Sequence, residues 1–156
     1  MAKLTIVAHI VAKPDNPDIV VGGSYGGYLR VINHRSGSVR SIDVWPDNPM
    51  GWGAAELKYR FQWTFPIAIS PHDHNKVYVG SQHVHQTTDA GHSWQVISPD
   101  LSTHNQEYQQ RSGGIAPDNL GVEYGCVIFA LAESPLEAGL IWAGTNDGQM
   151  QVTRDG

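Results

Sequence analysis

Short apolar runs recur along the chain, and each is followed by a proline and then a glycine at one fixed spacing. A proline stands nine residues before a glycine in three places, which are Pro14 and Gly23, Pro71 and Gly80, and Pro135 and Gly144. An apolar run precedes each proline, and a strand-like run leads to each glycine. Self-similarity of this kind indicates a repeat architecture, in which similar units stack on one another.

Within each unit, short alternating runs of β-branched and aromatic residues are separated by turn formers, which predicts antiparallel meanders. The first unit has candidate strands near residues 5–12, 18–24, 28–33 and 38–44. The second has them near 62–70, 76–82, 84–88 and 93–98, and the third near 126–133, 140–145 and 149–153. Four-stranded units with recurring glycine and tryptophan are typical of β-propeller blades.

We therefore expect an all-β fold, an incomplete β-propeller of about two and three-quarter four-stranded blades. Blade one covers residues 1–44, blade two 61–98 and partial blade three 126–156, with insertion loops at 45–60 and 99–125. An open set of blades exposes two sheet edges and an unfinished core. We expect either self-association through these open edges or a rearranged, barrel-like fold.

The most specific motif is Thr87-Thr88-Asp89-Ala90-Gly91-His92-Ser93-Trp94. Its pattern, Ser/Thr-x-Asp-x-Gly-x-x-Trp, is called an Asp-box. It combines a carboxylate that accepts backbone N–H bonds across a turn, a glycine where a Cβ would strain the backbone, and a tryptophan that covers the turn. The sequence ends inside a second copy of the motif. We assign a structural role to five residues, which are Thr87, Asp89, Gly91, Trp94 and Asp155.

Three segments carry a family resemblance: Ser70-Pro71 to Gly80, the Asp-box with Ile97 to Leu101 after it, and Ala130 to Gly148. With them the chain resembles bacterial proteins with neuraminidase-type (BNR, Asp-box) repeats, often labelled glycosyl hydrolases and similar to sortilin-type propellers. The resemblance implies a propeller fold, and related full-length proteins are expected to be exported. It does not fix the activity, because the same repeat serves enzymes, receptors and assembly factors.

Composition and charge exclude some classes of binding partner. The chain is 40% hydrophobic and 16% charged, as is usual for a globular domain. A net charge of −5 without a basic cluster argues against nucleic acid. No apolar run is long enough to span a bilayer, and the N-terminus lacks a convincing signal peptide, so no membrane partner is expected. Neutral carbohydrates and small esters or lactones remain as the expected binding partners.

Two features suit a hydrolase that acts on a glycan, the function that the resemblance favours. Trp45 and Trp52 lie among turn formers in the first insertion, and an exposed aromatic ring can stack on a sugar. Alternatively, both rings simply pack the loop onto a blade edge. Glycosidase chemistry needs two carboxyl groups, and Glu123 and Glu133 flank one apolar strand, where partial burial would raise the pKa of Glu133.

A second hypothesis is a hydrolase of a small lactone or ester that depends on bound Ca²⁺ or Zn²⁺. Period-2 alternation would place His83 and His85 on one face of a strand, an arrangement that suits a metal. Asp147, in an Asn-Asp-Gly loop, is a candidate oxygen ligand. The alternative is that these histidines are ordinary strand residues and Asp147 an ordinary turn residue. A third hypothesis is a non-catalytic propeller fragment that binds carbohydrate or protein.

Overall fold

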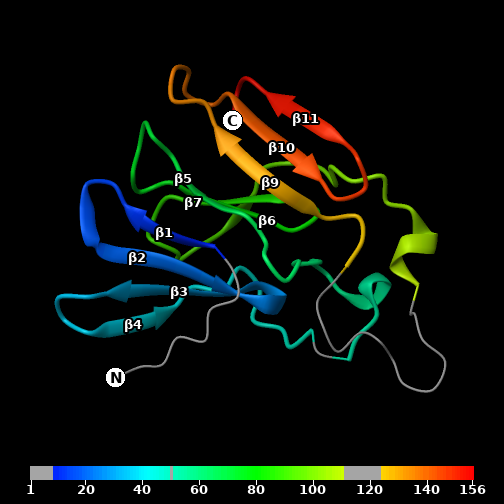
Figure 1. Ribbon diagram of the computed structural model, residues 1–156, viewed down its shortest axis with the longest axis horizontal. Helices are drawn as coiled ribbons and strands as arrows, with labels where there is room; N and C mark the ends of the chain where they lie inside the picture. The colour runs from blue at the N-terminus through cyan, green and yellow to red at the C-terminus, as the bar shows by residue number, and fades with distance from the viewer. Residues whose placement is uncertain (1–8, 50, 111–123) are drawn as a thin grey trace.

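The computed structural model describes residues 9–49, 51–110 and 124–156, which form three antiparallel sheets (Figure 1). The first sheet contains β1 (Ile10–Lys13), β2 (Asn16–Ser24), β3 (Tyr28–Asn33) and β4 (Ser38–Ser41). The second contains β5 (Ile67–Ile69), β6 (Val77–Gly80), β7 (Val84–Thr87) and β8 (Gln95–Val96). The third contains β9 (Ile128–Glu133), β10 (Ile141–Thr145) and β11 (Met150–Thr153). The all-β prediction is confirmed for these residues.

In each sheet the strands pair in chain order, as the meander pattern predicts. The described helical segments are three short 3₁₀ helices in the connections, which are η1 (Tyr25–Gly27), η2 (Ala54–Glu56) and η3 (Gln106–Gln109). The largest departure from the predicted strands is the late start of β5. There the N–H of Phe65 bonds to the carbonyl of Gln62 in a turn, and Pro66 has no N–H to give to a strand ladder.

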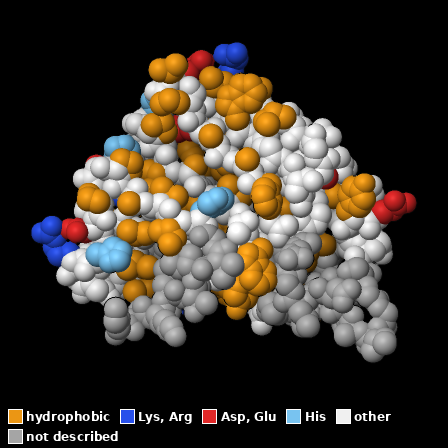
Figure 2. Space-filling view, viewed as in Figure 1, with side chains coloured by type: hydrophobic (Ala, Val, Ile, Leu, Met, Phe, Trp, Pro, Cys, Tyr) orange, Lys and Arg blue, Asp and Glu red, His pale blue; other side chains and the backbone are white. Residues whose placement is uncertain are grey.

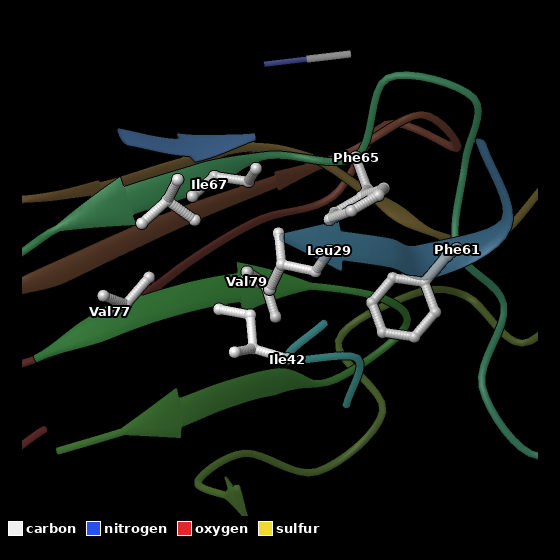
Figure 3. Packing of buried hydrophobic residues seen from close by; sticks show 8 residues of the cluster. Leu29, Ile42, Phe61, Phe65, Ile67, Val77 and Val79 are labelled. Carbon is white, nitrogen blue, oxygen red and sulfur yellow. The ribbon is translucent and has the colours of Figure 1, made fainter. Parts of the chain in front are cut away.

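The main core lies between the first and second sheets (Figure 3). Leu29 and Phe65 have no exposed surface, and burying each side chain stabilises the fold by about 2 to 3 kcal/mol. Alternation along β6 divides its side chains between two interfaces. Val77 and Val79 belong to this core, whereas Tyr78 packs in a second cluster with Ile128 and other residues of the third sheet.

The three sheets are arranged around their first strands, since β1 contacts β5 and β5 contacts β9. This is the order expected of propeller blades around an axis. The described residues do not close a ring, and their third sheet has the order β11-β10-β9, with β11 at its edge. The predicted number of blades thus stays a prediction. In this part of the chain, no helix has the length and apolar character that crossing a membrane requires.

Candidate functional site

Aromatic side chains gather at the end of the sheets where β2 leads into β3 and where β5 and β9 begin. We call this region the aromatic end, and it consists of Tyr25, Trp45, Trp52, Tyr59, Trp63 and Phe129. Within it, the rings of Tyr25 and Trp63 lie 5.5 Å apart between centroids, and those of Trp45 and Tyr59 meet edge to face at 6.3 Å. Hydrophobic side chains spread over the visible face of the molecule, with charged groups mostly at its margins (Figure 2).

Trp45 and Trp52, predicted to bind substrate, are both half-exposed, at 44% and 51%. The ammonium group of Lys58 lies 3.6 Å from the centre of the Trp45 ring, a cation–π contact that fixes the orientation of the ring. Near Trp52, the carbonyl of Pro49 accepts two hydrogen bonds, one from the N–H of Trp52 and one from the hydroxyl of Tyr124. Both rings therefore present part of their surface to solvent.

An open hollow of about 410 Å³ lies at the aromatic end, lined by Gln62, Trp63, Thr64 and Phe129. Its walls combine two aromatic side chains with an amide and a hydroxyl. Hydrogen bonds hold the Gln62 amide, whose Nε2 donates to the carbonyl of Tyr124 and whose Oε1 accepts from the N–H of Trp63. Sequence reasoning missed this hollow. The available signal is the alternation of aromatic and polar residues from Phe61 to Phe65, but this period-2 pattern predicts a strand.

A partly buried ion pair anchors the start of the long connection that follows the second sheet. The guanidinium of Arg60, only 4% exposed, lies 2.9 Å from a carboxylate oxygen of Asp100 and also donates to the carbonyl of Cys126. Burial alone would raise the pKa of Asp100, but hydrogen bonds from Ser102 and Arg60 keep that pKa below its usual value. His104 Nδ1 lies 3.2 Å from the same carboxylate. Arg60 thus binds three segments together.

Replacing Arg60 with alanine is expected to lower the free energy of unfolding by about 2 kcal/mol, because it leaves Asp100 and the Cys126 carbonyl without their charged partner. Arg35 provides the matched control. It pairs with Asp18 at 2.7 Å but is 83% exposed, and the loss of such a pair costs about 0.5 kcal/mol or less. Urea unfolding of both variants measures the difference, and equal losses would contradict a structural role for the partly buried pair of Arg60 and Asp100.

The two histidines predicted to bind metal are close together but point into the protein. Their ring centroids are 6.3 Å apart, and His83 lies one residue before β7. His85 is fully buried against Tyr59 and Phe61, and its Nε2 lies 2.7 Å from the Ser81 hydroxyl. His83 Nδ1 is 3.1 Å from the carbonyl of Ser98. Among residues 9–49, 51–110 and 124–156, no three His, Cys, Asp or Glu side chains form a group that suits a metal.

The Asp147 carboxylate is occupied by protein donors. It accepts hydrogen bonds from the hydroxyl and N–H of Thr103 and from the hydroxyl of Thr145. Burial alone would raise the pKa of Asp147, but these hydrogen bonds bring it down to about 2. Asp147 therefore joins the β10–β11 turn to the connection before the third sheet, and it lies apart from any group of metal ligands in the described chain.

Glu133, a predicted catalytic residue, lies at the last position of β9, whereas the aromatic end contains the start of this strand. Its Oε1 accepts the N–H of Gly139 at 2.9 Å, while Oε2 is buried without a hydrogen-bond partner among the described residues. Burial first, and the nearby Glu133 charge second, raise the pKa of Tyr78. Glu123, its proposed partner, lies outside the described residues, so the carboxyl pair stays a prediction.

The turn from Thr87 to Trp94 is held by its own side chains. Asp89 accepts hydrogen bonds from the N–H and hydroxyl of Ser93 and from the hydroxyl of Thr87, and those from Ser93 contribute most to lowering its pKa. Gly91 has a φ of +80°, and its N–H donates to the Thr87 hydroxyl. The Trp94 indole N–H donates to the carbonyl of Ile42, across the interface between the first and second sheets. In the third sheet, the hydroxyl of Thr153 likewise donates to Asp155.

No family model matches this chain, and no curated protein matches its sequence. Among solved structures, the chain is similar to a GH74 xyloglucanase from Xanthomonas campestris, a propeller enzyme, with a TM-score of 0.57 and 14% identity. The match covers 94% of this chain and 20% of that enzyme, so the chain spans about a fifth of its length. The computationally designed Ika4 protein also matches, with a TM-score of 0.36 and 14% identity over 99% of this chain and 96% of Ika4. The first likeness shows a propeller-like, all-β fold.

Proposed function

We propose that this chain is part of a glycoside-hydrolase-type β-propeller and that its aromatic end binds a neutral glycan. The observation that carries the proposal is that Trp45 and Trp52 are both half-exposed in one connection of a propeller-like fold. Aromatic rings stack on the apolar faces of sugars, while amides and hydroxyls bond to sugar hydroxyl groups. The hollow beside Trp63 and Phe129 supplies this second kind of contact.

The described carboxylates support binding more directly than catalysis. Glu133 lies at the end of β9 away from the aromatic end, and Asp147 is occupied by threonine donors. A glycosidase needs two carboxyl groups on either side of one glycosidic bond. In this proposal the residues described here hold the glycan, and any hydrolysis depends on residues beyond them, including Glu123.

Replacing Trp45 or Trp52 with alanine is expected to weaken glycan binding about tenfold, because one stacked ring contributes roughly 1 to 2 kcal/mol. Trp142 is the matched control, since it is 47% exposed but lies near the start of β10, in the third sheet. Titration calorimetry with xyloglucan and cellulose oligosaccharides measures the affinities. The choice of probe follows the enzyme with the similar fold.

The outcomes of these measurements separate the hypotheses. Loss of binding in the Trp45 and Trp52 variants but not in the Trp142 variant supports the proposal. Equal losses in all three variants, or no binding by the unaltered chain, contradict it. Release of new reducing ends from the bound oligosaccharide distinguishes a hydrolase from a binding module, and repeating the assay with EDTA tests the metal-dependent alternative.

A further inference from the structure

A cavity lies at the margin of the main core, at the opposite end of the sheets from the aromatic end. It has a volume of about 230 Å³ and lies between the first and second sheets, where β1 ends and β6 begins. Its walls are mostly aliphatic and are formed by Ile19, Val21, Val31, Ile42, Ile69 and Val77. All of these except Ile19 belong to the main core or pack against it, so the walls are part of the folded core.

Polar side chains mark the opening of this cavity. Lys13, the last residue of β1, lines the cavity together with His74 and Asn75, which lie between β5 and β6 (Figure 1). The side chains of Lys13 and His74 are 24% and 32% exposed, whereas Val21 and Val77 are buried. The cavity therefore meets solvent beside Lys13 and His74.

The ammonium group of Lys13 gives this opening a positive charge. Lys13 Nζ donates to Asn75 Oδ1 at 3.2 Å and lies 3.3 Å from a carboxylate oxygen of Asp15. Asp15 holds Lys13 in place but does not line the cavity, and neither does any other Asp or Glu of the described chain. An ammonium group has three N–H donors, so a ligand in the cavity meets a positive charge and one further donor.

The volume and the walls indicate the size and shape of a ligand. An apolar cavity of about 150 Å³ holds one benzene molecule, so by proportion this cavity holds about nine non-hydrogen atoms. The apolar walls consist of branched aliphatic side chains without an aromatic ring on which a flat ligand could stack. A flexible hydrocarbon chain suits such walls, and each methylene group that it buries raises affinity about fourfold.

We propose that this cavity binds a medium-chain aliphatic monocarboxylate of about eight carbon atoms. The hydrocarbon tail lies among the aliphatic side chains of the two sheets, and the carboxylate pairs with the Lys13 ammonium at the opening. This site is independent of the glycan-binding proposal, because it shares no residue with the aromatic end. Either proposal can therefore fail without affecting the other.

The direct test compares octanoate with octan-1-ol on the unaltered chain. Both ligands have the same tail, but only octanoate carries the negative charge that Lys13 recognises. Protein labelled with ¹³C at the valine and isoleucine methyl groups reports binding by NMR. We expect saturable binding of octanoate with a dissociation constant of about 1 mM or lower, and binding of octan-1-ol about tenfold weaker. The largest shifts are expected at Val21, Val31 and Val77.

Tail length tests burial of the hydrocarbon chain. Hexanoate is shorter than octanoate by two methylene groups and is expected to bind about tenfold more weakly. Equal affinities of the two carboxylates would contradict an apolar cavity as the site, because a carboxylate held only by surface charge does not depend on its tail.

Variants of Lys13 test recognition of the carboxylate. Lys13→Met keeps an apolar side chain of similar length but removes the ammonium group. It is expected to weaken octanoate binding about tenfold and to leave octan-1-ol binding unchanged. Lys76→Met is the matched control, since Lys76 is also partly exposed and lies in the same connection, but does not line the cavity. Equal losses in both variants would assign the effect to the overall charge.

A variant that fills the cavity locates the tail. Val31→Phe is expected to weaken binding of both ligands about tenfold. Val39→Phe is the matched control, since Val39 is 40% exposed and pairs with Ile32 on the other face of the first sheet. If Val31→Phe fails to fold, the contrast between octanoate and octan-1-ol still decides. No saturable binding of octanoate, binding of octan-1-ol at least as tight, or methyl shifts confined to other parts of the chain would overturn the proposal.

Discussion

Replacing Gly91 with alanine is expected to lower the free energy of unfolding by about 3 kcal/mol, because two separate costs combine at this position. The backbone of Gly91 has a φ of +80°, a conformation that alanine adopts only with strain. An added Cβ would also lie 2.6 Å from the Cβ of Ile42, in the core between the first and second sheets. The Cβ of Ile42 is attached directly to the backbone, so it cannot move aside as easily as the end of a flexible side chain.

The Gly37→Ala variant is the control that distinguishes backbone strain from steric overlap. The φ of Gly37, +71°, is similar, but nothing lies within 4 Å of the position that its Cβ would take. The Gly37→Ala variant therefore incurs the backbone cost alone, about 1 kcal/mol. Chemical unfolding of both variants measures the difference, and a Gly91→Ala variant as stable as Gly37→Ala would show that the turn does not press on Ile42.

The turn that contains Gly91 also joins two neighbouring sheets. Ile42 meets Gly91 on one side, and its carbonyl accepts the indole N–H of Trp94. Arg40 adds a further link from β4 to the carbonyl of Ala90. The turn between β7 and β8 in the second sheet thus holds β4, the last strand of the first sheet.

Much of the fold follows from local patterns that the sequence displays. Alternating side chains and the spacing of Pro71 to Gly80 predict β6, and the observed strand lies within the predicted residues 76–82. Gly37, with positive φ, lies in the turn expected between β3 and β4. Such features depend on neighbouring residues, so one segment at a time is sufficient to predict them. The all-β fold is confirmed, and a solved propeller enzyme has a similar structure. The number of blades stays a prediction.

The site depended on contacts between distant segments, which one sequence does not reveal. Arg60 and Asp100 are forty residues apart and meet only because the long connection returns to the second sheet. Period 2 brought the rings of His83 and His85 near each other, but it did not show that Tyr59 and Phe61 would enclose His85. The turn formers around Trp45 and Trp52 predict that both rings are exposed. The hollow at Trp63 could not be predicted in this way, because it forms only where Phe129 of β9 comes close to residues 62–64.

Acidification is expected to destabilise the protein through His85, with a loss of about 2 to 3 kcal/mol between about pH 7 and pH 4.5. Burial, with a smaller contribution from the charge of His83, lowers the pKa of His85 to about 3. The same imidazole titrates near 6.5 in the unfolded chain. Between these values the unfolded state binds a proton that the folded state does not, so stability is present above about pH 6.5 and is lost as the pH falls toward 3.

The surroundings of His85 explain the size of the effect. Its Nε2 pairs with the Ser81 hydroxyl, and its Nδ1 is buried without a hydrogen-bond partner among the described residues. A proton on Nδ1 would place a charge and an unpaired donor against the ring of Tyr59, 4.6 Å away between centroids. Asp100 and Asp147, whose pKa values are lowered, lose their stabilising effect only below about pH 4 and leave this window to the histidine.

The His85→Phe variant tests this assignment, because phenylalanine keeps an aromatic ring among Tyr59 and Phe61 but cannot bind a proton. Urea unfolding at intervals from about pH 4.5 to pH 7 is expected to show a shallower loss of stability than in the unaltered chain. His85→Gln serves as a second variant if the first does not fold, and His92→Gln, at an exposed position, controls for losing an imidazole elsewhere. Parallel stability curves for the unaltered chain and both His85 variants would assign the acid sensitivity to other groups.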